Sequence, residues 1–129
     1  MMYYRRKIVL ALLEAFGGEL EKLQLQKLLM LFTTYQEDKS FHFVPYKFGC
    51  FSFQANADLS TMKKYAQVEE GERTWKKTDP TAYWSTLKPE DRKAIARLKT
   101  KFQGHSSEEL IRYTYVHYPY FAINSTVAD

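Results

Sequence analysis

The sequence predicts a mainly α-helical protein with a small β component, built as a winged-helix-like core followed by two C-terminal helices. Segments with helical spacing of apolar residues alternate with short segments rich in aromatic and β-branched residues. Their order is helix, helix, short strand, helix, hairpin, which is the order of a winged helix whose strand pairs with the hairpin. We expect residues 1–78 to form this core and residues 79–129 a helical appendage, together making a single domain over 1–129.

The first two predicted helices are separated by a glycine pair. Apolar residues between Tyr4 and Phe16 recur at helical spacing, and Gly17-Gly18 can end that helix in the left-handed conformation. The second helix is predicted from about Glu19 to Tyr35. One of its faces is apolar and is made by Leu25, Leu28, Leu29 and Phe32.

Residues 41–51 are aromatic and β-branched, and they predict the short extended segment of the core. Pro45 cannot donate to a strand ladder and therefore favours an edge or a break, while Gly49 favours a bend. Ser52 or Asp58 is predicted to cap the third helix, because either side-chain oxygen can accept a hydrogen bond from a free helix amide.

The remaining elements have clear start and stop signals. Residues 68–78 are predicted to form the β-hairpin, or wing, with its turn around a Glu-Gly pair. Pro89 begins a fourth helix, because proline suits the first helical position. Ser106 and Glu109 predict a capping box at the start of the last helix, which Pro119 ends.

The composition excludes several classes of protein. With 45% hydrophobic and 26% charged residues in a chain of 129, the sequence is that of a globular domain. Its single cysteine excludes an internal disulfide framework and a cysteine-rich zinc site, and it predicts a cytoplasmic location. No apolar run approaches the ~18 residues of a membrane span, and no small-residue cleavage site follows the basic N-terminus.

The charge is unevenly distributed. The formal net charge is +4, but residues 71–105 carry nine Lys and Arg against four Asp and Glu. Residues 106–129 carry one against three, and the first 70 residues are nearly balanced. Such a local excess favours a polyanion or an acidic partner surface.

Five cations of the third helix and the hairpin are predicted to lie together and to contact the phosphates of a nucleic acid. They are Lys63, Lys64, Arg73, Lys76 and Lys77. The competing interpretation is a solvated basic face, and Glu69, Glu70 and Glu72 lower the charge of the hairpin. Gln54 and Asn56 could reach base edges from the third helix.

The tyrosine-rich segment near the C-terminus is the second candidate site. Its aromatic side chains cannot all lie on one side of a helix, so some must be exposed or covered by another surface. Tyrosine offers a large rigid contact with a polar tip, which suits an interface. The predicted protein interface is Tyr115, Tyr118 and Tyr120. The alternative is that these rings pack into the core of the appendage.

Catalysis is not predicted. The three histidines are isolated from one another and from carboxylates at metal-ligand spacing, so no metal site is expected. The sequence has no nucleophile elbow and no glycine-rich phosphate loop. Cys50 and His42 could form a dyad across a tight strand turn, but Cys50 lies among phenylalanines and is expected to pack as a small hydrophobe. We therefore expect a non-enzyme without metal or cofactor.

Two short motifs resemble a known family. Leu25-Gln26-Lys27-Leu28-Leu29 is followed by the segment 46–52 and by Leu59, and this arrangement resembles the Panacea (SocA-like) antitoxin domain over residues 20–78. Cys50 stands where that family usually has proline. Residues 44–59 and 113–125 also resemble the N-terminal region of bacterial proteins that continue into a small α/β domain of unknown function. The resemblance implies an antitoxin-like or antiphage-defence module that works by binding.

Two hypotheses follow for the function. The first is a non-enzymatic antitoxin-like or defence-associated module that contacts nucleic acid through its basic helix–hairpin face. The second is a pure protein-interaction or neutralising module whose basic face meets an acidic partner protein, such as a toxin. The sequence leaves open the partner, any base specificity and the oligomeric state.

Overall fold

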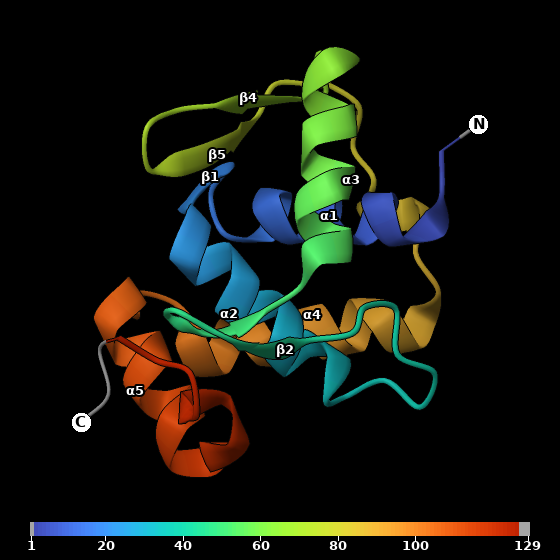
Figure 1. The fold of residues 1–129 in the computed structure, drawn as a ribbon. Helices are drawn as coiled ribbons and strands as arrows, with labels where there is room; N and C mark the ends of the chain where they lie inside the picture. The colour runs from blue at the N-terminus through green and yellow to red at the C-terminus, as the bar shows by residue number, and fades with distance from the viewer. Residues whose placement is uncertain (1, 127–129) are drawn as a thin grey trace.

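The first half of the chain folds as a winged helix with a small hairpin inserted before its third helix. The computed structural model describes residues 2–126. The elements of this half are α1 (Tyr4–Ala15), β1 (Glu19–Glu21), α2 (Lys22–Thr33), β2 (Val44–Tyr46), β3 (Gly49–Phe51), α3 (Phe53–Lys64), β4 (Val68–Glu70) and β5 (Thr74–Lys77). The mainly α class with a small β component is confirmed, and β4 and β5 form the predicted wing beside α3 (Figure 1).

The strand that pairs with the wing is not the predicted one. The three-stranded antiparallel sheet has the order β1-β5-β4, and Leu20 of β1 lies opposite Trp75 of β5. Gly17 and Gly18 both have positive φ values and turn the chain back from α1 onto β5. The Gly18 carbonyl then accepts a hydrogen bond of 2.8 Å from the Lys77 amide. The expectation that this strand lies within residues 41–51 is therefore wrong.

Residues 41–51 instead contain a separate two-stranded hairpin. β2 and β3 are antiparallel, with Pro45 opposite Cys50 and Tyr46 opposite Gly49. Gly49 has a φ of +96°, and a β-carbon there would lie 2.8 Å from Cε1 of Tyr115. This position requires glycine both for its backbone conformation and for the close approach of the ring.

The cap residues correct two predicted boundaries. The second helix begins at Lys22 rather than at Glu19, because Glu21 and Gln24 form a capping box in which the Glu21 amide donates to Oε1 of Gln24 at 2.8 Å. Ser52 caps α3 and accepts from the Ala55 amide at 3.1 Å. Asp58 is not a cap, since it lies inside α3 with its side chain buried.

The second half is helical, as predicted. Its elements are η1 (Trp84–Thr86), α4 (Pro89–Phe102), α5 (Ser107–His117) and η2 (Pro119–Ala122). Pro89 occupies the first turn of α4, and the capping box of Ser106 and Glu109 begins α5. Helix α4 packs against α1 and α2, and α5 packs against α2 and β3. One continuous core therefore joins the winged helix to the appendage.

Helices α1 and α2 form the centre of that core. Residues 8–13 of α1 and 25–33 of α2 are buried without interruption, so neither helix has a wet face along these stretches. Each fully buried Leu or Ile contributes about 1.5–3 kcal/mol relative to its exposed state. Among the described residues, no helix is both long and apolar enough to cross a membrane.

Candidate functional site

The wing and α3 lie side by side, but their cations do not form one free basic face. Nζ of Lys63 is 3.0 Å from Oε1 of Glu70, and Nζ of Lys22 is 2.6 Å from the other oxygen of the same carboxylate. Hydrogen bonds lower the pKa of Glu70, and the bond from Lys22 contributes more than the bond from Lys63. This wing carboxylate is thus held between two lysines, and Lys63 is paired with it although its side chain remains 54% exposed.

Lys77 is turned away from the predicted site. Side chains alternate along β5, so Lys77 shares the inner face of the wing with buried Trp75, and Lys76 lies on the outer face. Nζ of Lys77 lies 3.4 Å from Oε2 of Glu14 and donates to the Thr81 carbonyl at 2.8 Å. Its side chain is only 10% exposed. Lys77 therefore lies apart from the exposed cations of the predicted basic face, because its ammonium group is bound beneath the sheet.

The other three cations are exposed. Lys64 lies at the end of α3, Arg73 just before β5, and Lys76 on the outer face of the wing. Within residues 2–126 these three side chains make no ion pair. Lys76, however, lies between Glu69 and Glu19 in the strand register. The structure therefore leaves a diluted basic surface in place of the compact cluster of five.

The three predicted interface tyrosines have different environments. Tyr115 is half-buried, hydrogen-bonds to Ser125 and presses its ring against Gly49. Tyr118 is half-buried against the core, whereas Tyr120 is 60% exposed. Tyr115 and Tyr118 are thus largely occupied within the chain, and Tyr120 alone of the three offers most of its surface to solvent.

The inserted hairpin displays an aromatic surface that the sequence analysis did not identify. Strands β2 and β3 turn Cys50 into the core and Val44, Tyr46 and Phe51 to the outside, where Phe53 of α3 joins them. We call these four residues the aromatic face. The ring centroids of Tyr46, Phe51 and Phe53 lie 4.9–5.3 Å apart in tilted and edge-on pairs. Phe53 is 56% exposed, Val44 43% and Tyr46 39%.

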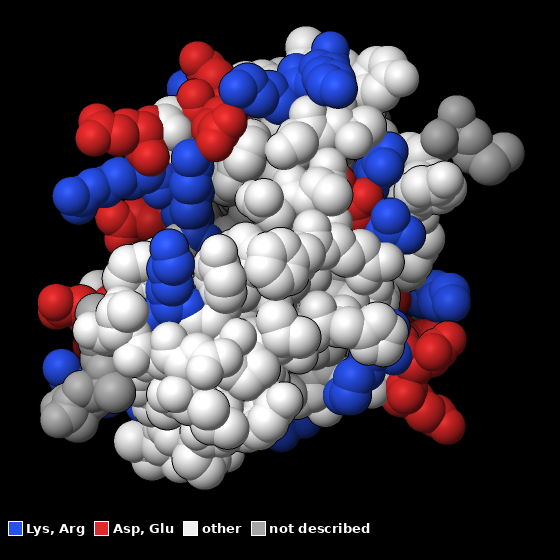
Figure 2. All heavy atoms as spheres, in the orientation of Figure 1, with Lys and Arg blue, Asp and Glu red and all other residues white. Residues whose placement is uncertain are grey.

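Few charges interrupt this side of the molecule. Figure 2 shows an uncharged expanse over β2, α3 and the helices below them, with the Lys, Arg, Asp and Glu side chains around its border. Apolar surface that is exposed in a contiguous patch and bordered by polar groups marks an interaction site. The sequence shows that side chains alternate from Val44 to Tyr46 and from Gly49 to Phe51. It does not show which side of the two strands faces water.

The aromatic face is anchored from behind by α2. The side chain of Gln26 clamps the backbone of Ser52, accepting from its amide at 2.8 Å and donating to its carbonyl at 3.2 Å. Lys27, only 1% exposed, donates to the Cys50 carbonyl at 3.0 Å. Burial lowers the pKa of Lys27. The Leu-Gln-Lys-Leu motif therefore fixes the chain between β3 and α3.

Cys50 does not have the environment of a catalytic nucleophile. Its thiol is fully buried, and this burial raises the pKa of Cys50 to about 11. His42 is exposed on the segment before β2. In the part of the chain that the structure describes, no three His, Cys, Asp or Glu side chains are grouped to hold a metal ion.

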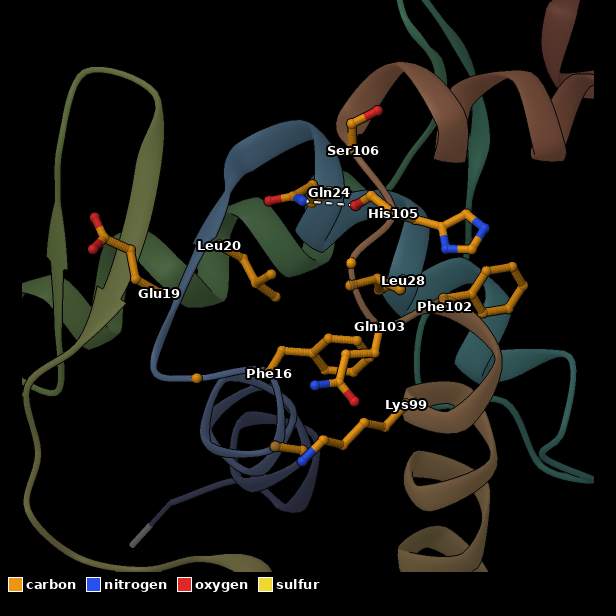
Figure 3. Close-up of a pocket in the computed structure, with 13 residues that line it drawn as sticks. Phe16, Glu19, Leu20, Gln24, Leu28, Lys99, Phe102, Gln103, His105 and Ser106 are labelled. Atoms are coloured by element: carbon orange, nitrogen blue, oxygen red, sulfur yellow. Dashed lines mark hydrogen bonds between the residues drawn. The ribbon is translucent and has the colours of Figure 1, made fainter.

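A cavity of about 410 Å³ lies where the core meets the appendage (Figure 3). Phe16, Leu20 and Leu28 form apolar walls of the cavity. Gln24 also lines it and donates to the His105 carbonyl at 3.0 Å. The same Gln24 side chain also caps α2. The Gln24 side chain thus already links α2 to the α4–α5 connection. The cavity therefore lies at a structural contact between the two halves of the chain.

No protein-family model matches the chain, and no curated protein matches it significantly.

Proposed function

We propose that the chain is a protein-binding module whose docking surface is the aromatic face. The observation that supports this proposal best is the outward display of Val44 and Tyr46 on a hairpin whose other side is buried, with exposed Phe53 of α3 beside them. Aromatic residues are enriched, and charged residues depleted, at the centres of protein interfaces. Covering these rings with a partner would remove apolar area from water, which is the main driving force of association.

The rigidity of the face supports the same proposal. Gln26 and Lys27 hold the backbone on which the rings stand, and Tyr115 packs against Gly49. A surface that is already ordered loses less conformational entropy when a partner binds. The resemblance of residues 20–78 to the Panacea antitoxin domain is in keeping with this role, because it implies a neutralising module that works by binding. We extend the proposal to that setting, a bacterial antitoxin or antiphage defence.

The test compares capture of partners by the full chain and by single variants. Phe53→Glu places a charge in the aromatic face, and Val116→Glu places the same charge at an exposed position of α5, outside that face. We expect a protein that co-purifies in stoichiometric amount with the wild type and with Val116→Glu, and that is lost with Phe53→Glu. Circular dichroism and thermal unfolding must show that both variants are folded. Equal retention by the two variants would refute the proposal.

Binding to nucleic acid is the second candidate, and one observation favours it. The helix α3 lies beside the wing in the position of a recognition helix, with Lys64, Arg73 and Lys76 exposed (Figure 1). Against it, a recognition helix reads bases with its N-terminal residues, and this end of α3 carries Phe53 and its aromatic neighbours.

Electrophoretic mobility shifts with duplex DNA and RNA at two salt concentrations test this second candidate. Contact with phosphates predicts binding that weakens steeply with salt and that Lys64→Glu reduces. The absence of a shift at low salt would exclude it.

A further inference from the structure

We propose that the partner docks an acidic amphipathic helix along α3, with the apolar end of that helix on the aromatic face. This inference rests on the proposed function and names the chemistry of the partner. It follows from the charges on either side of α3 and from the residues on the outer ridge of that helix.

The outer ridge of α3 is neutral until its last turn. Residues spaced three or four apart share one face of a helix, and the exposed ridge runs through Phe53, Ala57, Ser60 and Lys64. Phe53 joins the ridge to the aromatic face, the two middle residues are small, and Lys64 adds a positive charge at the far end. A chain of 12 residues at ~1.5 Å each gives a ridge of about 18 Å.

Each flank of the ridge carries an ion cluster with one cation in excess. On the side of the wing, Glu70 is bound by Lys22 and Lys63. On the side of α1, Asp58 is bound by Arg5 and Arg6, with nearest distances of 2.5 and 2.9 Å. Every cluster thus holds two cations and one carboxylate. The two clusters and Lys64 together carry a formal charge of +3.

The carboxylates of both clusters are already occupied. Asp58 is the one carboxylate in the sequence of α3, and its side chain is 2% exposed, so it offers no charge to a ligand. The arginines remain 18–29% exposed and the lysines 36–54%, so the cations can still reach a partner. An approaching surface therefore meets positive charge on three sides of a neutral ridge that begins at the aromatic face.

This pattern complements a helix with an apolar stripe and carboxylates along its borders. Its apolar stripe would cover Phe53 and the small residues of the ridge, and its carboxylates would face the cation clusters. A nucleic acid duplex would be drawn by the same charges, but its bases are stacked inside and would leave Phe53, Tyr46 and Phe51 without apolar contacts. The aromatic face thus favours the acidic helix over a duplex, and competition with a single strand is one outcome of the test.

The test uses two synthetic peptides of 14 residues, each with leucines at helical spacing. One carries glutamates at its polar positions, and its twin carries lysines. Affinity is measured by fluorescence anisotropy, and the site is mapped by amide shifts of the ¹⁵N-labelled full chain. We expect the acidic peptide to shift amides of residues 53–64 and to bind at least about fivefold tighter than its twin, with a difference that shrinks in salt.

Variants separate the ridge from the rest of the surface. Lys64→Glu and Phe53→Glu should each weaken binding of the acidic peptide about fivefold or more. Lys93→Glu on α4, with the same change of net charge as Lys64→Glu, should alter binding less than twofold. Ser60→Lys should strengthen it. Equal affinity for both peptides, shifts confined to residues outside 44–64, or displacement of the acidic peptide by an equimolar 20-nucleotide strand would overturn the inference.

Failure of this inference can be distinguished from failure of the proposed function. If Phe53→Glu abolishes capture of a natural partner while the acidic peptide shows no preference, the docking surface stands and the acidic helix is wrong. If Phe53→Glu leaves capture intact, the docking surface itself is wrong.

Discussion

Asp58 links the first helix to the third, and its replacement should destabilise the whole protein. Its side chain is 2% exposed and accepts from Nε of Arg5 at 2.5 Å, from Nη2 of Arg5 at 3.0 Å and from Nε of Arg6 at 2.9 Å. Asp58→Asn keeps the volume but removes the charge, so the two guanidinium groups lose their counter-ion. Removing one partner of a buried ion pair costs about 3–5 kcal/mol.

The expected loss for Asp58→Asn is smaller than that upper range. The arginine side chains are 29% and 18% exposed, so water can partly solvate them once the carboxylate is gone. We expect the free energy of unfolding to fall by about 2–3 kcal/mol. With a urea m-value of about 1–3 kcal/mol/M, the unfolding midpoint falls by roughly 0.7–3 M.

Urea unfolding followed by circular dichroism measures this loss. Asp38→Asn is the matched control, because Asp38 is exposed. Its free energy of unfolding should change by no more than about 0.5 kcal/mol. Replacing Asp58, Arg5 and Arg6 together by uncharged residues should recover part of the loss, since no uncompensated charge then remains. A loss below about 1 kcal/mol for Asp58→Asn would refute the view that these ion pairs hold α1 on α3.

Three further predictions concern the inserted hairpin. Gly49→Ala should cost about 2–4 kcal/mol in urea unfolding and Gly104→Ala only about 1–2, because both have positive φ but only the first would push a β-carbon against Tyr115; equal costs would contradict the close approach. Cys50 should react with a thiol reagent at pH 8 at least about 100-fold more slowly in the folded than in the unfolded protein, because burial raises its pKa to about 11; fast labelling would restore a reactive cysteine. Burial lowers the pKa of Lys27, so between that pKa and 10.5 the unfolded chain binds more protons and the stability of the wild type should rise with pH relative to Lys27→Met; parallel stability curves would show that Lys27 is not desolvated.

The local signals of the sequence were accurate where one residue type decides the structure. Ser52 caps α3, the box of Ser106 and Glu109 begins α5, and Pro89 begins α4. These features depend on a side chain and the amides within one turn of it, so spacing alone identifies them. The wing was predictable for a similar reason, because a Glu-Gly turn between alternating segments is a local pattern.

The errors concern contacts between distant segments. The second helix looked continuous from Glu19 because leucines at helical spacing begin at Leu20, yet this leucine pairs with Trp75 of β5. The strand order depends on the turn at Gly17 and Gly18, whose direction no periodicity reveals. Tertiary pairing thus overrode a helical pattern over the first three residues of that segment.

The cations of the predicted basic face are dispersed for an electrostatic reason. Counting charges in the sequence treats each lysine as free. In the structure, Lys77 is bound beneath the sheet beside Glu14, and Lys63 and Lys22 share the carboxylate of Glu70. Whether a cation is available depends on the carboxylates that folding brings next to it. The charges that remain are therefore better described as the border of α3 than as a phosphate-binding cluster.

Burial of Gln26 and Lys27 of α2 is unfavourable in itself, and the position of the aromatic face explains what these two residues do there. Burying a lysine and an amide is unfavourable unless each finds hydrogen-bond partners, and both Gln26 and Lys27 find theirs on the backbone of residues 50–52. An apolar pair at these positions would pack as well without fixing that backbone. The polar pair thus specifies the register of the hairpin, so that Cys50 faces the core and Phe51 faces out. A slip of one residue would reverse the two sides of β3 and bury the rings that we propose meet the partner. The winged helix therefore serves as a scaffold for its insertion, and we place the binding surface on the insertion and α3 rather than on the wing.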